Sequence, residues 1–179
     1  MKKLIKSTLV ILIIKMIIGT TRFNTTTWNE NRLWREKNHP TGCAYGLMKT
    51  IGVSIPLNSG VFVLEMNNST NEIMGIGLIT NCPDPPENVR VYRDHNYCCF
   101  LYKGKFRIDR SELSEREKII IRIFEYLVFA NKTHLKRGQG ITSLPEKMIK
   151  EVFDKGMDLN YELALMFRSR FYTAPSPLG

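Results

Sequence analysis

The sequence lacks the short motifs that mark the commonest classes of enzyme. It contains no P-loop, no G-x-S-x-G motif, no H-E-x-x-H motif and no dinucleotide-binding glycine fingerprint. Its three histidines, His39, His95 and His134, lie far apart along the chain, and no two of its four cysteines have the C-x-x-C spacing of a zinc site. These absences favour a binding protein over an enzyme, and we expect no catalytic residue, metal ion or cofactor.

The chain has only one long apolar run, and a charge interrupts it. "MKKLIKSTLVILIIKMIIG" (1–19) has the basic start and apolar centre of a secretory signal, but Lys15 leaves the run too short to span a bilayer. We favour the other interpretation, a buried strand over 8–18 that is rich in Ile, Val and Leu. We therefore expect an intracellular protein, cytoplasmic or nuclear, with no membrane partner. The alternative is a secreted, glycosylated binding protein that loses its first nineteen residues.

Cysteines and N-x-S/T sequons bear on the choice between these two locations. Two of the cysteines are adjacent, so on a strand their side chains point to opposite faces. We interpret all four as small buried hydrophobes in a reducing compartment, whereas a secreted protein would pair them and could carry glycans. Asparagine and threonine are abundant enough for sequons to arise by chance. The cysteines are Cys43, Cys82, Cys98 and Cys99, and the sequons begin at Asn24, Asn67, Asn68 and Asn131.

Positive charge is what the sequence has in excess. The 179 residues carry a formal net charge of +9, and 43% of them are hydrophobic. That length and apolar share suit a single globular domain. Excess positive charge attracts polyanions, of which nucleic acid is the commonest and an anionic membrane surface the second. The charge therefore favours a nucleic-acid partner, DNA or RNA.

Hydrophobic patterning predicts an α+β fold. Two apolar stretches, 60–66 and 72–80, flank the polar link "NNSTN" and predict a β-hairpin. Thr27 and Glu30 have the spacing of a capping box, which predicts a short helix after them. We expect further strands over 88–94 and over 97–109, the second turning at Gly104, and helices over 28–37, over 115–130, from Pro145 to Gly156 and over 159–170.

A basic, glycine-containing loop is the sharpest candidate for ligand binding. "HLKRGQG" places His134, Lys136 and Arg137 beside two glycines, Gly138 and Gly140. Glycine lets the backbone approach a phosphate, and the two basic side chains would neutralise phosphate charge. Gln139, between the glycines, could read a base edge or bind sugar. On the strand before it, alternation places Lys103, Lys105 and Arg107 on one face, either as further phosphate contacts or as a solvated surface.

Aromatic and glycine positions complete the candidate site. Trp28 and Trp34 are the only tryptophans, and they lie in the polar stretch "TTTWNENRLWREKN". An exposed indole that stacks on a base contributes about 1–3 kcal/mol, although packing in the core is the alternative for each tryptophan. Gly75 and Gly77 interrupt an apolar strand, which indicates a bulge, a bend or a close approach to a ligand.

The order of these elements resembles the PUA-like superfamily and, within it, the EVE and YTH domains. The resemblance covers residues 8–155 and rests on "GVFVLEMNNSTNEIMGIGLI", on "LKRGQGITSLPEKMIKEVF" and on Trp28 after the first strand. It implies a small antiparallel β-barrel of five or six strands flanked by helices over 1–156, with a C-terminal helix and frayed tail over 157–179. It also implies a base pocket formed by Trp28, Trp34, Gly75 and Gly77, and a basic turn that contains Arg137.

The sequence therefore predicts a module that binds nucleic acid, including a modified or flipped base. A hydrolase of nucleosides or nucleic acid on the same barrel is the other possibility, with Glu30 or Glu65 as the carboxylate in the pocket.

Overall fold

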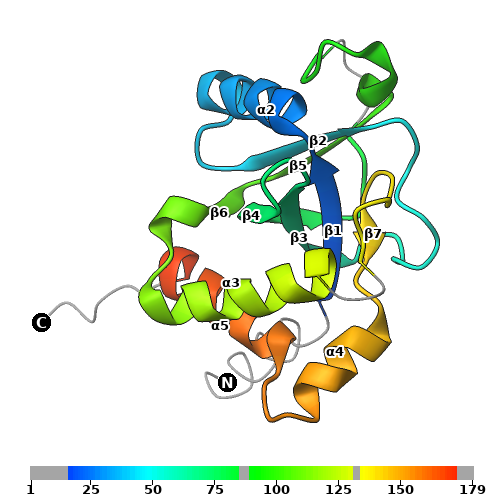
Figure 1. Ribbon diagram of the computed structural model, residues 1–179. Helices are drawn as coiled ribbons and strands as arrows, with labels where there is room; N and C mark the ends of the chain where they lie inside the picture. Colours follow the sequence, from blue (N-terminus) through cyan, green and yellow to red (C-terminus); the bar gives the residue numbers. More distant parts are fainter. Residues whose placement is uncertain (1–15, 85–88, 131–133, 173–179) are drawn as a thin grey trace, which may run out of the picture.

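A five-stranded mixed sheet forms the centre of the protein (Figure 1). The computed structural model describes residues 16–84, 89–130 and 134–172. The strand order is β6-β4-β3-β1-β7, with β1 parallel to β3 and the other neighbours antiparallel. A separate antiparallel pair consists of β2 and β5. The strands are β1 (Ile17–Phe23), β2 (Cys43–Leu47), β3 (Gly60–Asn67), β4 (Glu72–Thr80), β5 (Phe100–Gly104), β6 (Phe106–Asp109) and β7 (Thr142–Ser143).

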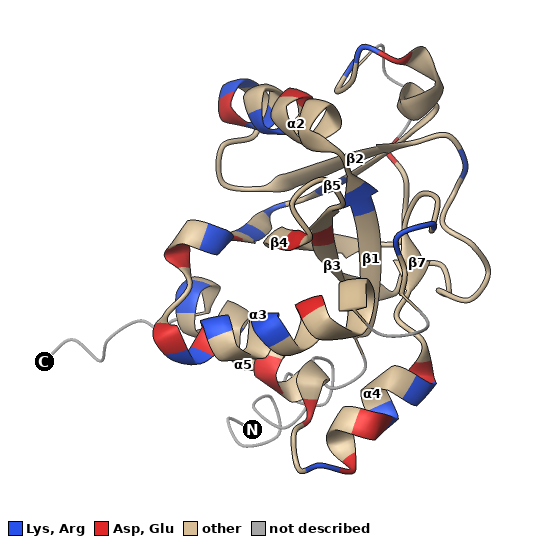
Figure 2. Cartoon of the chain, in the orientation of Figure 1, with Lys and Arg blue, Asp and Glu red and all other residues tan. Residues whose placement is uncertain are grey.

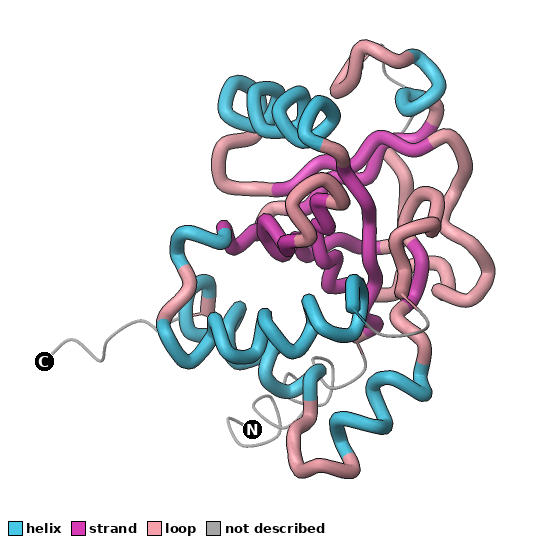
Figure 3. Tube along the Cα trace, viewed as in Figure 1, coloured by secondary structure: helices cyan, strands magenta, loops and turns pink. Residues whose placement is uncertain are grey.

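Helices cover both faces of this sheet (Figures 1 and 3). The helix α2 lies with the β2–β5 pair on one side, and α3, α4 and α5 lie on the other. The helices are α2 (Thr25–Asn38), α3 (Glu115–Glu125) with the π-helical turn η3 (Tyr126–Ala130), α4 (Glu146–Phe153) and α5 (Leu159–Phe171), and the short 3-10 turns are η1 (His95–Cys98) and η2 (Arg110–Glu112).

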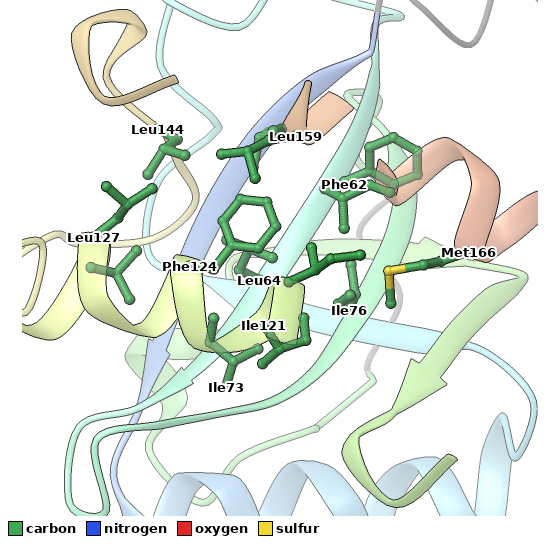
Figure 4. Packing of buried hydrophobic residues seen from close by; sticks show 14 of the residues in the cluster. Phe62, Leu64, Ile73, Ile76, Ile121, Phe124, Leu127, Leu144, Leu159 and Met166 are labelled. Atoms are coloured by element: carbon green, nitrogen blue, oxygen red, sulfur yellow. The ribbon is translucent and has the colours of Figure 1, made fainter. Parts of the chain in front are cut away.

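The alternation of side chains along β3 explains why the protein has two hydrophobic cores. Phe62 and Leu64 point toward α3 and α5, whereas Val61 and Val63 point toward α2 and β2. A strand that is buried on both faces is apolar along most of its length, and "GVFVLEM" is apolar apart from Glu65. Figure 4 shows the first of these cores, in which side chains of β3 and β4 pack against those of α3 and α5.

The last helix belongs to the first core. Leu159, Leu163 and Phe167 of α5 are almost fully buried there, and the Phe167 ring lies 5.1 Å from that of Phe62 on β3. The C-terminal helix expected over 159–170 is therefore present and packs on the sheet. Residues 173–179, the predicted frayed tail, lie outside the described residues.

The hairpin β3–β4 and the helices α3, α4 and α5 confirm the sequence predictions, but the barrel is not found. Among the described residues, β6 and β7 are the open edges of the central sheet, so its pairing does not close. No strand is formed over 89–94, and the predicted 97–109 strand is divided into β5 and β6 at Lys105. The first strand begins at Ile17, so most of the predicted strand 8–18 lies outside the described residues.

The start of α2 also differs from the prediction. Asn24, not Thr27, is the N-cap: its Oδ1 accepts a hydrogen bond from the Thr27 N–H at 2.8 Å, and Thr27 Oγ1 accepts one from the Asn24 N–H at 3.0 Å. A threonine can thus take the reciprocal role that the capping-box pattern assigns to Glu or Gln. The helix therefore begins three residues early, which moves Trp28 from its first turn into its body.

Candidate functional site

Trp28 is a core residue and not a surface for stacking. Its side chain is 7% exposed, and the guanidinium groups of Arg35 and Arg107 each lie 5.5 Å from its ring centroid. The Phe23 ring packs edge-on against it at 5.5 Å. The expectation that Trp28 stacks on a base is therefore wrong for this structure, because neighbouring side chains already cover the indole. Trp34 is partly buried against the same core.

Arg107, expected to bind phosphate, instead forms a buried ion pair. Its guanidinium donates to both carboxylate oxygens of Glu65, with distances of 3.0 Å from Nε and 2.7 Å from Nη2. The Glu65 side chain is fully buried, and Nη1 of Arg107 also bonds Asp109 at 2.7 Å. Burial disfavours the charge on Arg107, but the charge of Glu65 and these hydrogen bonds raise the guanidinium pKa. Lys103 pairs with Asp84 at 2.7 Å. It lies on β5, whereas Arg107 lies on β6 in the other sheet, so the two do not share one face of a single strand as predicted.

Gly75 and Gly77 provide space for this buried network. A side chain at Gly75 would collide with the guanidinium of Arg107, and one at Gly77 with the hydroxyl of Tyr45. That hydroxyl donates to Glu65 Oε1 at 2.8 Å. The close approach that the glycines indicated is thus made by protein side chains, and neither glycine lines the pocket described below.

The two nucleophilic groups beside this ion pair are held protonated. Burial, assisted by the charge of Glu65, raises the pKa of the Cys43 thiol to about 12. Burial likewise raises the pKa of Tyr45 well above its ordinary value. Neither group is ionised near neutral pH, and neither is accessible. We interpret this network as a structural element that joins β2 and the edge strand β6 to β3 through Glu65.

An open pocket of about 550 Å³ lies where β1 ends and α2 begins. Phe23 and Leu47 form part of its apolar surface, and Tyr97 of η1 stands at one wall, 37% exposed. The Tyr97 ring packs edge-on against that of Tyr92 at 6.1 Å. The polar lining residues are Thr21, Arg22, Asn24, Thr27, Lys49, Thr50, Asn68, Tyr92, Tyr97, Gln139 and Thr142.

The charge of this pocket is positive. Arg22 and Lys49 line it, and its described lining residues include no Asp, Glu, His or Cys. Figure 2 shows basic residues at the upper end of β1 and in the loop that precedes β7. Asn68, also in the wall, donates from Nδ2 to the carbonyl of Lys136 at 2.9 Å, while its buried Oδ1 has no hydrogen-bond partner among the described residues.

The basic glycine loop borders this pocket but contributes less to its lining than we expected. Gln139 and Gly140 line it, and Gly140 adopts a φ of +69°, which favours glycine. Arg22 Nη1 donates to the carbonyl of Lys136 at 3.2 Å, which ties the loop to the end of β1. The Lys136 ammonium lies 5.7 Å from the Phe129 ring centroid. His134, Lys136, Arg137 and Gly138 are outside the lining, and the first and third are exposed.

Three lining residues carried no signal in the sequence. Tyr97, Arg22 and Lys49 belong to separate segments that only the folded chain brings together. Arg22 is the second-last residue of β1. The short turn η1 that holds Tyr97 has no periodic pattern, so its aromatic residue could not be distinguished from the other tyrosines.

Structural contacts occupy several of the residues that the two rival functions require. Glu65 is buried against Arg107, and Glu30 is 3.6 Å from Arg93, so neither carboxylate lines the pocket that we describe. The four cysteines are free, although only Cys43 is buried; Cys82 and Cys99 are exposed. Two of the sequon asparagines are held by contacts within the protein. The Asn24 side chain caps α2, and Asn67 is 3% exposed, with its Oδ1 accepting a hydrogen bond from the Ser69 N–H.

No group of three or more His, Cys, Asp or Glu side chains among the described residues could hold a metal ion. None of the helices in the described ranges is long and apolar enough to cross a membrane. No protein-family model matches the chain, and neither does any curated protein or solved structure.

Proposed function

We propose that the pocket at the end of β1 binds an unpaired base of a nucleic-acid strand. The observation that carries the proposal is that one pocket combines an exposed tyrosine, Tyr97, with two cations, Arg22 and Lys49. Aromatic side chains stack on bases irrespective of sequence, and cations at the rim of a groove hold the phosphates. This arrangement is typical of sites for single-stranded nucleic acid.

The size and surface of the pocket support this proposal. Its volume of about 550 Å³ lies within the ~300–1,000 Å³ range of sites for small ligands. The apolar surface from Phe23, Leu47 and Ile141 suits the flat face of a base, whereas Gln139 and Thr50, both exposed, supply polar groups for its edge. A base held in this way would be unpaired, because polar groups of the pocket would take the place of its pairing partner.

Charge beyond the pocket also supports an anionic ligand. Lys136 and Arg137 follow each other in the loop that Arg22 holds against β1, and the whole chain has a formal net charge of +9. Phosphates on either side of the bound base would meet these residues. The proposal agrees with the resemblance to EVE and YTH domains, with Tyr97 in place of Trp28 as the stacking residue.

Titration of a short fluorescent single strand, as RNA and as DNA, tests this function. Tyr97→Ala should weaken binding by about 1–3 kcal/mol. Lys49→Ala should weaken binding to all sequences and reduce the salt slope by about 1. Tyr126→Ala and Lys147→Ala change exposed residues of η3 and α4, outside the pocket, and serve as matched controls. Equal effects in site and control variants, or no binding at low salt, would contradict the proposal.

A further inference from the structure

A fully exposed valine stands beside the pocket at the tip of a tight turn. Val53 is 101% exposed. The residues around it form the turn, in which the Ile55 N–H donates to the Gly52 carbonyl at 3.0 Å. Ile51 and Ile55, on either side, are buried in the second core. The chain therefore enters the core, projects one apolar side chain into solvent and returns to the core.

This turn lies next to the pocket, so Val53 is placed to contact a ligand bound there. Gly52, the preceding residue, lines the pocket, so Val53 lies just outside the pocket wall. Met48, in the same segment, also lines the pocket and is 44% exposed. Tips of turns usually carry Gly, Pro, Asn, Asp or Ser. A single exposed apolar residue needs no explanation by itself, but here two of them flank a cationic pocket that we propose for a base.

The turn is also held in place by its neighbours. The Ile51 N–H donates to the Tyr102 hydroxyl at 3.1 Å, and Asn81 Nδ2 donates to the Ile55 carbonyl at 2.8 Å. Ser143 of β7 bonds Ser54 through their hydroxyls at 3.4 Å. Three elements thus fix the turn, so Val53 can be pressed against a ligand with little loss of conformational entropy.

We infer that Val53 is a wedge that enters the base stack of a duplex while a base is held in the pocket. The inference rests on the proposed function and extends its ligand from single strands to duplexes that contain a weak base pair. Proteins that unstack duplexes insert apolar side chains between bases. The free-energy cost of unstacking and unpairing a base is lowest at mismatched pairs. Val53 would fill part of the space that the flipped base leaves, and Lys49, four residues earlier, would hold the strand.

A duplex with a central mismatch, carrying 2-aminopurine as the mismatched base, tests this inference. The fluorescence of 2-aminopurine rises when the base leaves the stack. Wild-type protein should raise it, and Val53→Ser should reduce duplex affinity about tenfold. Because Val53 buries no surface in the free protein, this variant should fold normally and bind the matching single strand as wild type does. Ile119→Ser, at an exposed apolar position on α3, is the control and should change neither affinity.

The outcomes separate this inference from the function on which it rests. If wild-type protein binds neither single strand nor duplex, the proposed function fails. If it binds the single strand but leaves the fluorescence of the duplex unchanged, only the wedge is overturned. The wedge is also overturned if Val53→Ser binds the duplex as tightly as wild type, or if Ile119→Ser weakens duplex binding equally.

Discussion

The guanidinium of Arg107 joins Glu65 to Trp28 in the middle of the protein. It donates hydrogen bonds of 2.7–3.0 Å to the carboxylate of Glu65 and lies 5.5 Å from the centroid of the Trp28 ring. Three residues that the sequence suggested for ligand binding or catalysis are thus linked through Arg107 and buried. Together they hold α2, β3 and β6 in one unit, which leaves the neighbouring open pocket as the candidate site.

Replacing Arg107 with alanine should strongly destabilise the fold. The change leaves the charge of Glu65 buried without its partner, and breaking a buried ion pair in this way lowers the free energy of unfolding by about 3–5 kcal/mol. Urea unfolding followed by circular dichroism measures the loss. Lys105→Ala, two residues away and exposed, is the control and should change stability by less than about 0.5 kcal/mol. A loss below about 1 kcal/mol for Arg107→Ala would show that the pair behaves as a surface ion pair.

The two tryptophans should differ in their effect on stability. Trp28→Ala removes an indole that is 7% exposed, and such changes lower the free energy of unfolding by about 3–5 kcal/mol. Trp34 is partly buried at the edge of the same core, so Trp34→Ala should lower the free energy of unfolding by clearly less. Thermal unfolding of the two variants gives the comparison. Equal losses would contradict the placement of Trp28, and so would a Trp28→Ala variant of unchanged stability.

Stability should fall in acid partly through Glu117. Hydrogen bonds from Arg170 hold the pKa of the Glu117 carboxyl at about 2, below its ordinary value of 4.5. Because the folded value is the lower one, the contribution is present above about pH 5 and is lost as the pH falls toward 2. Glu117→Gln should therefore lose less stability than wild type over this interval, as measured by urea unfolding at each pH. Glu151→Gln, exposed on α4, should follow the wild-type curve.

The four cysteines should react at very different rates in the native protein. Cys43 is buried and its pKa is raised to about 12, so it offers no thiolate to an alkylating agent. Cys82 and Cys99 are exposed and should react first with iodoacetamide, with Cys98 slower. Peptide mass spectrometry at several times after mixing gives the order. Early modification of Cys43 before unfolding would contradict its position in the core.

The sequence predicted the parts of the fold that have strong local signals. The β3–β4 hairpin has two apolar stretches around a polar turn, and α3 has the capping pair Ser114 and Glu117 before its apolar stripe. The strand β7 has only two residues, and its pairing with β1 depends on contacts across 122 positions of the chain. Local patterns carry no information on such a contact, so β7 was not predicted.

The candidate site was less predictable because residue type does not reveal burial. Trp28 and Arg107 are of the types that bind nucleic acid. In this fold, however, the Arg107 guanidinium pairs with Glu65 and covers the Trp28 ring. Tyr97 and Lys49 belong to no sequence motif. They become candidate binding residues only because β1, β2 and η1 bring them to one pocket. The sequence did not show that the basic loop lies beside the end of β1, and most of its charged residues are outside the pocket lining.

Photochemical crosslinking is the measurement that tests the proposed site most directly. A short single strand with one 5-iodouracil, irradiated in complex with the protein, joins the base to an aromatic residue that stacks on it. The account predicts a crosslinked peptide that contains Tyr97, lost in Tyr97→Ala and retained in Tyr126→Ala. Crosslinks at residues outside the pocket, or crosslinking of equal yield in Tyr97→Ala, would contradict it.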